Sequence, residues 1–238
     1  MKMIREYCNL TGMKFLKDIY YLLLDHLYPN TCIVCKQFVE QREHSICSSC
    51  WNQFEKIPNQ NKVKDLLVND CIDSAFSMWS FNKGFDNVIH TLKYSDMAKL
   101  GNELGTQLGQ NISFKDFQSV DTITAVPLHP VKYRDRGYNQ AEWIAKGLAS
   151  IWKIPFDKTI LKRNRFTVSQ TTLNREKRQA NMANAFTVEK DVTNKSILII
   201  DDVLTTGSTT SSCAKELKKA GASHVHVLTL SAPPTLKA

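Results

Sequence analysis

One stretch of the sequence decides the fold: Ile197-Leu198-Ile199-Ile200-Asp201-Asp202-Val203-Leu204-Thr205-Thr206-Gly207-Ser208-Thr209. Its four consecutive aliphatic residues predict a strand that is buried on both faces of a parallel sheet. Two adjacent carboxylates follow at the carboxyl end of that strand, which is where ligands bind in open α/β sheets. A loop of hydroxyl side chains around a glycine then leads into a predicted helix, and free backbone N–H groups at a helix N-terminus suit a phosphate.

The residue types around this loop narrow the class of ligand. Gly207 allows the backbone to approach an anion closely or to take a positive φ. Asp201 and Asp202 cannot hold a phosphate, but they can accept hydrogen bonds from sugar hydroxyls or face Mg²⁺ through water. Anion donors beside diol acceptors predict a site for a ribose 5-phosphate. The alternative is a buried strand with a polar turn, for which two adjacent carboxylates would be a costly choice.

Length, composition and charge restrict the class of protein. The 238 residues suit one α/β domain with a small appendage. A formal net charge of +8 favours polyanionic ligands such as nucleotides, diphosphates or nucleic acid, or else reflects only a basic surface. The best candidate for a membrane span, residues 19–24, is too short and is followed by Asp25 and His26. We therefore expect a cytoplasmic protein without membrane insertion.

Four of the seven cysteines form two Cys-x-x-Cys pairs, Cys32/Cys35 and Cys47/Cys50, separated by eleven residues. Four thiolates in such pairs can close a tetrahedral shell around Zn²⁺, which leaves no open position for catalysis. The pattern therefore predicts a structural zinc site, with His44 in the intervening loop as a bystander. The alternative is four free cysteines in a site that has lost its metal.

The order of predicted elements indicates the fold class. Strands are expected over residues 75–81, 123–127, 197–200 and 225–230, with a further short strand after Phe186. Helices are expected over residues 85–94, 97–108, 139–152 and 208–220. This alternation predicts an α/β fold, with a parallel, doubly wound sheet flanked by helices. We expect an N-terminal helix and zinc-ribbon-like module over residues 1–60, a linker over 61–74 and the α/β domain over 75–238.

A second set of anion contacts follows the strand at 123–127. Leu128 and His129 lead into a predicted basic loop that carries Arg134 and Arg136. Guanidinium groups hold diphosphate oxygens in bidentate fashion, although a solvated basic loop would have the same composition. Residues 162–178 are also strongly basic, and we interpret them as a lid or a polyanion contact.

Residues 197–209 resemble the phosphoribosyl diphosphate (PRPP) signature of type I phosphoribosyltransferases. Together with the cysteine pairs, they make the chain similar to the ComF family, the group of ComFC-like and GntX-like proteins. The resemblance covers most of the chain from about residue 15. It rests on Pro29 with the four cysteines, Leu92-Lys93-Tyr94, Pro127-Leu128-His129-Pro130, Arg136-Gly137-Tyr138-Asn139-Gln140 and Ile197–Thr209.

This resemblance implies PRPP and Mg²⁺ as ligands, beside a structural Zn²⁺. Asp201 and Asp202 would take the ribose hydroxyls, and together with Arg136 and Arg175 they would be the catalytic residues. The PRPP-binding set implied by the resemblance is Asp201, Asp202, Val203, Leu204, Thr205, Thr206, Gly207, Ser208, Thr209, Leu128, His129, Arg134, Arg136 and Lys93.

The implied function is a phosphoribosyltransferase linked to natural competence and DNA uptake, which displaces diphosphate from PRPP with an unidentified nucleophilic acceptor. One alternative is a non-catalytic PRPP-binding regulator or adaptor of the DNA-uptake machinery. The other is a zinc-containing binder of single-stranded nucleic acid, for which charge and aromatic residues near the cysteine pairs are modest. Competence proteins and single-stranded DNA are the expected macromolecular partners.

Overall fold

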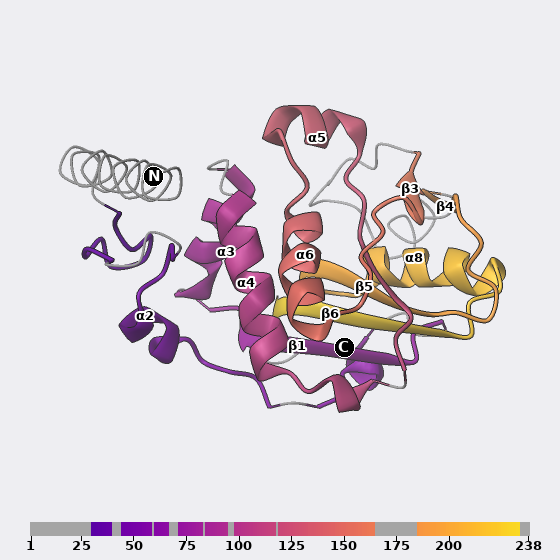
Figure 1. The fold of residues 1–238 in the computed structure, drawn as a ribbon, viewed down its shortest axis with the longest axis horizontal. Helices are drawn as coiled ribbons and strands as arrows, with labels where there is room; N and C mark the ends of the chain where they lie inside the picture. The colour runs from indigo at the N-terminus through magenta and orange to yellow at the C-terminus, as the bar shows by residue number, and fades with distance from the viewer. Residues whose placement is uncertain are drawn as a thin grey trace, which may run out of the picture. The chain divides into compact units, whose positions relative to one another are not determined.

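The structure is a computed structural model, and it describes residues 30–39, 44–58, 60–66, 71–82, 84–94, 98–117, 119–164 and 185–233 (Figure 1). The chain divides into two compact units, Met1–Asn52 and Gln53–Ala238. The predicted limits 1–60, 61–74 and 75–238 stay a proposal about which parts fold independently. The predicted N-terminal helix lies outside the described residues. Among the helices that are described, none is long and apolar enough to cross a bilayer.

The first unit is built around the cysteine pairs. Helix α2 (Ser48–Gln53) begins within the second pair, and Thr31 forms an antiparallel bridge with Phe38 beside the first. The backbone N–H of Ile33 donates to the carbonyl of Ser45 at 2.9 Å, so the two pairs are held against each other by the main chain. Among the described residues of this unit only a few apolar side chains are buried, so a crosslink between the cysteine pairs would add to its stability.

The second unit has a four-stranded parallel sheet at its centre, as predicted (Figure 1). The strand order is β1-β6-β5-β2, with strands β1 (Ser74–Ser80), β6 (His224–Ala232), β5 (Ser196–Val203) and β2 (Thr122–Ala125). Ile197, Leu198, Ile199 and Ile200 on β5 have no exposed surface, because both faces of the sheet are covered. All four strands run in one direction, so their carboxyl ends lie at one edge.

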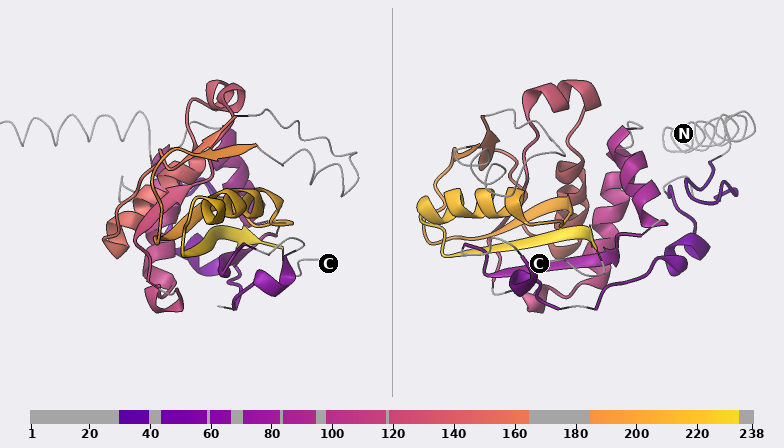
Figure 2. Two further views of the ribbon diagram at one scale, coloured as in Figure 1. Left: turned by 90° about the vertical axis from the view of Figure 1, so that its right-hand side faces the viewer. Right: turned by 180° about the vertical axis from the view of Figure 1, so that it is seen from behind.

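Helices cover both faces of the sheet (Figure 2). The described helices of this unit are α3 (Phe85–Tyr94), α4 (Ala98–Asn111), α5 (Pro130–Arg136), α6 (Gln140–Trp152) and α8 (Ser208–Lys219), with short 3₁₀ turns at Val63–Asp65 and Phe114–Asp116. Helix α8 packs on the face that carries Ile197 and Ile199. Helices α4 and α6 pack against each other, and α6 also contacts β2 and β5.

A two-stranded antiparallel ribbon lies outside the main sheet. It pairs β3 (Leu161–Arg163) with β4 (Phe186–Val188), so that Arg163 lies opposite Phe186. A strand starting at Phe186 was predicted, whereas its partner β3 was not. Most of the predicted basic lid, including Arg175, lies outside the described residues.

The prediction of a basic loop after β2 was wrong, because residues Pro130–Arg136 form the short helix α5. His129 caps its N-terminus, with Nδ1 accepting from the Val131 N–H at 3.3 Å. Pro130 suits the first helical position, and Gly137 ends the helix with a φ of +76°. These local signals outweigh the general tendency of Pro and Gly to mark a loop.

Helices α4 and α6 approach each other closely enough to bring backbone against backbone. A Cβ added at Gly105 would lie 1.9 Å from the carbonyl oxygen of Ile144, and one added at Gly147 would lie 2.1 Å from that of Asn102. Only glycine fits at these two positions, so they set the distance between the helices that cover one face of the sheet.

We predict that Gly105→Ala destabilises the protein by about 2 kcal/mol, because overlap with the Ile144 backbone exceeds the helix-propensity gain of about 1 kcal/mol. Urea unfolding of the purified chain measures this difference. Gly84→Ala is the matched control, since a Cβ there would meet only the Asn82 Oδ1 at 3.6 Å. Equal stability of the two variants would contradict the close approach of the helices.

Candidate functional site

The carboxyl end of β5 carries the two carboxylates, and the alternation of the strand sends them to opposite faces of the sheet. Asp201 follows Ile199 on the face that α8 covers, where it lines a hollow. Asp202 points to the other face, where it meets Lys93 and Gln140. The carboxyl end of β5 therefore presents one carboxylate to each of two separate environments.

The hollow beside Asp201 is small, with a cavity volume of about 40 Å³, and opens to solvent. The hydroxyl groups of Thr206 and Ser208 lie 2.8 Å apart within it. Gly207, with a φ of +75°, directly precedes the first turn of α8, where the Ser208 N–H donates to Thr206 Oγ1 at 3.4 Å. The N–H groups at the start of a helix point toward a ligand placed before it. The structure thus brings together the predicted loop in one concave surface, lined by Asp201, Val203, Leu204, Thr205, Thr206, Gly207, Ser208, Thr209 and Thr210.

The hydroxyl loop packs against Leu66, which the sequence analysis did not identify as a site residue. A Cβ added at Gly207 would lie 2.9 Å from Cδ2 of Leu66, which is itself buried. The segment before Leu66 is fixed to the sheet, because the Lys62 N–H donates to the Ala75 carbonyl at 2.7 Å and Asn61 Oδ1 accepts from the Ala75 N–H. Leu66 therefore packs against the loop at Gly207. No local sequence pattern around Leu66 predicts this contact.

Asp202 is a buried carboxylate with protein donors on both oxygens. Its Oδ2 lies 2.7 Å from Nζ of Lys93 and 3.4 Å from Nε2 of Gln140. Its Oδ1 accepts from the Val203 N–H at 2.8 Å. Arg136 Nη1 donates to Gln140 Oε1 at 3.1 Å, so the predicted residues Lys93 and Arg136 both belong to this part of the site.

Cationic side chains gather around Asp202, and one of them, Lys132, was not predicted. Burial lowers the pKa of Lys132, and the positive charges of Arg163, Arg136 and Lys93 lower it further, so these groups lie close together. Lys132 and Arg136 are four residues apart and therefore share one face of α5. The spacing of four residues is visible in the sequence, but it brings the two side chains to one face only if the segment is a helix.

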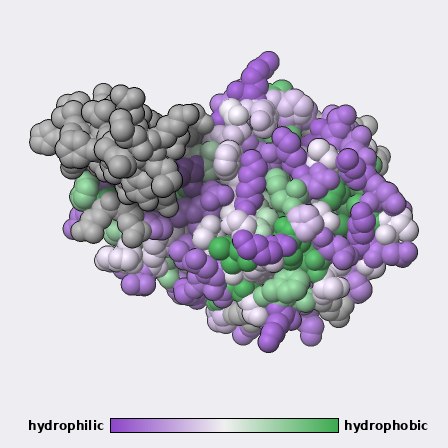
Figure 3. All heavy atoms as spheres, in the orientation of Figure 1, coloured by the Kyte–Doolittle hydropathy of each residue, from purple (hydrophilic) through white to green (hydrophobic). Residues whose placement is uncertain are grey.

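The other predicted contacts on this segment lie differently. Arg134 lies on the exposed side of α5, and the structure does not bring it to Asp202. Hydrophilic residues cover the end of the unit that α5 forms, at the top of the view in Figure 3. Leu128 and His129 are half-buried in the turn between β2 and α5, where His129 serves as the helix cap.

The pKa of Asp201 is shifted upward. Burial and the neighbouring Asp202 carboxylate raise it to about 8, although the Asp202 N–H and Lys93 act to lower it. Burial lowers the pKa of Arg163. Asp201 therefore holds its proton to a higher pH than an ordinary aspartate.

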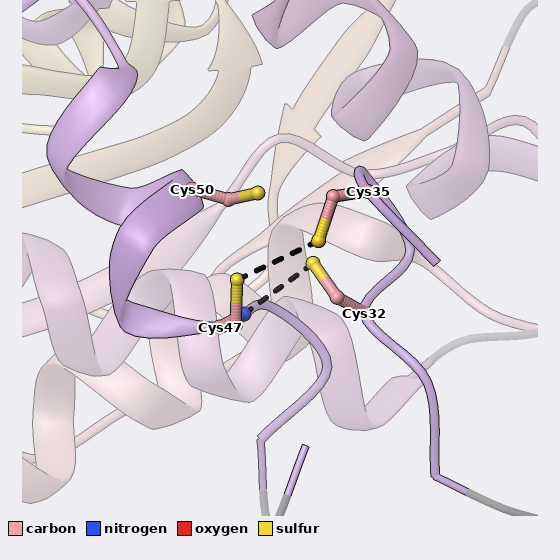
Figure 4. Close-up of side chains that lie close together, drawn as sticks. All are labelled: Cys32, Cys35, Cys47 and Cys50. Carbon is pink, nitrogen blue, oxygen red and sulfur yellow. Dashed lines mark hydrogen bonds between the residues drawn. The ribbon is translucent and has the colours of Figure 1, made fainter. Parts of the chain in front are cut away.

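The four cysteines of the first unit form one cluster (Figure 4). All four Sγ atoms lie within 4.8 Å of one another, and those of Cys35 and Cys47 are 3.7 Å apart. Zn–S bonds of about 2.3 Å place the sulfurs of a tetrahedron about 3.8 Å apart, so these residues fit a zinc ion. His44 is not a member of the cluster, as predicted.

Backbone donors prepare this cluster for a cation. The Cys47 N–H points to Cys32 Sγ at 3.4 Å. Burial acts to raise the pKa of Cys32, but hydrogen bonds from the N–H groups of Cys35, Cys47 and Val34 lower it to about 6. Burial and the neighbouring thiols raise the pKa of Cys50. The predicted structural zinc site is thus supported by its geometry.

Comparison with known proteins identifies both units. The Phosphoribosyl transferase domain family matches residues 136–237, and the Double zinc ribbon domain family matches residues 23–61. The first match contains α6, β5, α8 and β6 with the hydroxyl loop, and the second contains the four cysteines.

Whole proteins with the same combination are also similar. DNA utilization protein YhgH of Salmonella typhimurium is 29% identical over 82% of this chain and 87% of its own. Competence protein F of Haemophilus influenzae is 24% identical over 82% of this chain and 94% of its own, and Competence protein ComFC of Streptococcus pneumoniae is 26% identical over 78% and 86%. The chain thus combines a match to a double zinc ribbon with a match to a phosphoribosyl transferase domain, and over most of its length it is similar to proteins named for competence and DNA utilization.

Proposed function

We propose that this protein binds PRPP with Mg²⁺ and transfers the phosphoribosyl group to a nucleophilic acceptor. One observation carries the proposal. Neutral donors around Gly207 and a cluster of cations around Asp202 lie on either side of the paired carboxylates at one sheet edge. A ribose with a phosphate at one end and a diphosphate at the other has the matching sequence of groups.

Each part of the ligand has a proposed partner. The 5-phosphate would bind the loop Val203–Thr209, and the ribose hydroxyls would bind Asp201 and Asp202. Arg136 and Lys93, which were predicted, and Lys132, which was not, would hold the diphosphate, with Leu128 and His129 forming the turn beneath it. Arg134, on the exposed side of α5, and Arg175, outside the described residues, stay proposals from the family resemblance.

The proposed reaction breaks the bond between ribose C1 and the diphosphate oxygen and forms a bond from C1 to the acceptor. Its transition state resembles an oxocarbenium ion, so the task of the protein is positioning and charge stabilisation. Mg²⁺, bound through diphosphate oxygens and the carboxylates, would supply further charge neutralisation. Arg136 and Lys132 would stabilise the negative charge that develops on the leaving diphosphate.

The names of similar proteins support a biological setting for this proposal. Two of them are competence proteins and one is a DNA utilization protein, which supports a role in DNA uptake. A cytoplasmic location, and other competence proteins or single-stranded DNA as partners, belong to the proposal. A PRPP-binding adaptor without turnover is the second candidate. It is favoured by the fact that every described side chain named above binds or orients the ligand, which a binding protein also requires.

We expect Asp202→Asn to weaken PRPP binding at least tenfold, about 1.4 kcal/mol, because an amide keeps the size of the carboxylate but loses its charge and one acceptor. Calorimetry with PRPP and Mg²⁺ measures the change. Asp191→Asn is the matched control, since this exposed carboxylate accepts only from the Thr193 N–H in a turn. Unchanged affinity in the Asp202 variant would exclude the proposed ribose site.

The same variants separate the two candidates. Diphosphate release from PRPP should be measured across nucleobases, amines and DNA ends as acceptors. Release with one of them, lost in Asp202→Asn, supports the transferase. Tight PRPP binding with no release for any acceptor supports the adaptor.

The raised pKa of Asp201 predicts how stability depends on pH. Between the ordinary pKa of 3.8 and the folded pKa of about 8, the folded state binds more protons than the unfolded state. The free energy of unfolding should therefore fall as pH rises, by up to about 1.4 kcal/mol per pH unit. Unfolding midpoints measured from about pH 5 to pH 8 test this. Asp201→Asn should remove the slope, and an equal slope in both proteins would contradict it.

The zinc centre should be separable from the ligand site. We predict that Cys47→Ser loses the bound zinc and destabilises the first unit, because a closed four-thiolate shell tolerates no missing ligand. Cys71→Ser is the control, since Cys71 lies outside the cluster. Zinc content by atomic spectroscopy and thermal unfolding measure both effects. Zinc retained in full by Cys47→Ser would contradict the assignment.

A further inference from the structure

Asp202, which is proposed to bind ribose hydroxyls, is held by protein groups on both of its carboxylate oxygens. Asp202 Oδ2 makes the 2.7 Å ion pair with Lys93, and Oδ1 accepts from the Val203 N–H. Gln140 approaches Oδ2 from a third direction at 3.4 Å. A diol that binds Asp202 must therefore compete with Lys93 for the same oxygen.

Lys93 can leave this oxygen without any change in the fold. Its backbone belongs to the last turn of α3, where Leu92 has no exposed surface and its carbonyl accepts a hydrogen bond from the Tyr138 hydroxyl. The Lys93 side chain is one-quarter exposed, and its ammonium group is carried on a flexible four-carbon stem. The backbone at Lys93 is thus fixed, whereas its ammonium group can move from Asp202 to another nearby anion.

An anionic group bound beside Asp202 would offer the Lys93 ammonium a second ion-pair partner. Arg136 donates to Gln140, which approaches the same Asp202 oxygen as Lys93, so an anion that binds Arg136 lies near Lys93 as well. A ligand that carries both a diol and a diphosphate offers this second anion. A ribose phosphate without the diphosphate offers only the diol.

We propose that Lys93 determines specificity, by holding Asp202 until a ligand with an anionic group at C1 draws the ammonium away. This inference rests on the proposed function and adds a discrimination against ribose 5-phosphate. Breaking a pair that involves a buried carboxylate is costly when nothing replaces the partner. The diphosphate of PRPP replaces it and ribose 5-phosphate does not, so specificity arises from the difference between two affinities.

The test compares the affinities of PRPP and ribose 5-phosphate, each with Mg²⁺, for the wild-type chain and three variants. In Lys93→Met we expect the Kd of PRPP to rise about tenfold and that of ribose 5-phosphate to fall about tenfold. Lys132→Met is the matched control, because it removes a neighbouring cation that makes no ion pair with Asp202. It should weaken PRPP binding and leave ribose 5-phosphate unchanged. Lys93→Arg keeps the pair and should keep the discrimination.

A measurement on the wild-type chain removes any dependence on the folding of variants. In buffer without added Mg²⁺, so that no Mg²⁺ bridges the ligands, inorganic diphosphate should increase the affinity for ribose 5-phosphate about fivefold or more. The same coupling should be absent in Lys93→Met. It would arise because diphosphate takes Lys93 from Asp202 before the sugar binds.

The outcomes are distinct. If Lys93→Met weakens PRPP binding without any gain for ribose 5-phosphate, Lys93 is only a diphosphate contact and the inference fails. If diphosphate does not raise the affinity for ribose 5-phosphate in the wild-type chain, it also fails. If PRPP itself does not bind the wild-type chain, the proposed function fails first, and that result is separate from either of the others.

Discussion

The ion pair between Asp202 and Lys93 joins the carboxyl end of β5 to the last turn of α3, and the site depends on it. A carboxylate this deeply buried requires a cation and hydrogen bonds to remain ionised. Lys93, Gln140 and the Val203 N–H supply them. Gln140 in turn holds Arg136, so one buried charge organises residues from α3, α6 and the end of α5.

The alternation of β5 gives its two carboxylates different chemistry. Asp202 points among cations and stays paired, whereas Asp201 lies on the α8 face, where burial and the charge of its neighbour raise its pKa to about 8. Two adjacent aspartates thus occupy different electrostatic environments. A cation or a ligand that favours the ionised form of Asp201 must release that proton, which links occupancy of the site to pH.

The sequence predicted those parts of the molecule that local pattern determines. The apolar run 197–200 could only be a buried strand, and Gly207 could be assigned because a hydroxyl loop before a helix requires close backbone approach. Lys132 was missed because its role depends on α5, which a histidine cap and a terminal glycine create from a segment that otherwise has the composition of a loop. Leu66 was missed because its contact with Gly207 joins residues far apart in the chain, which no local pattern encodes.

The two ends of the proposed ligand are held by different kinds of groups, and this difference agrees with their fates in a transfer reaction. The loop around Gly207 offers backbone and hydroxyl donors on a rigid support formed by Leu66 and the first turn of α8. Such a cradle suits a phosphate that stays bound throughout. Lys93, Lys132 and Arg136 instead lie at the last turn of α3 and on a short outer helix, on long flexible side chains. In the proposed reaction, Lys93 would follow the diphosphate as it departs and then return to Asp202, so this ion pair would favour release of the product.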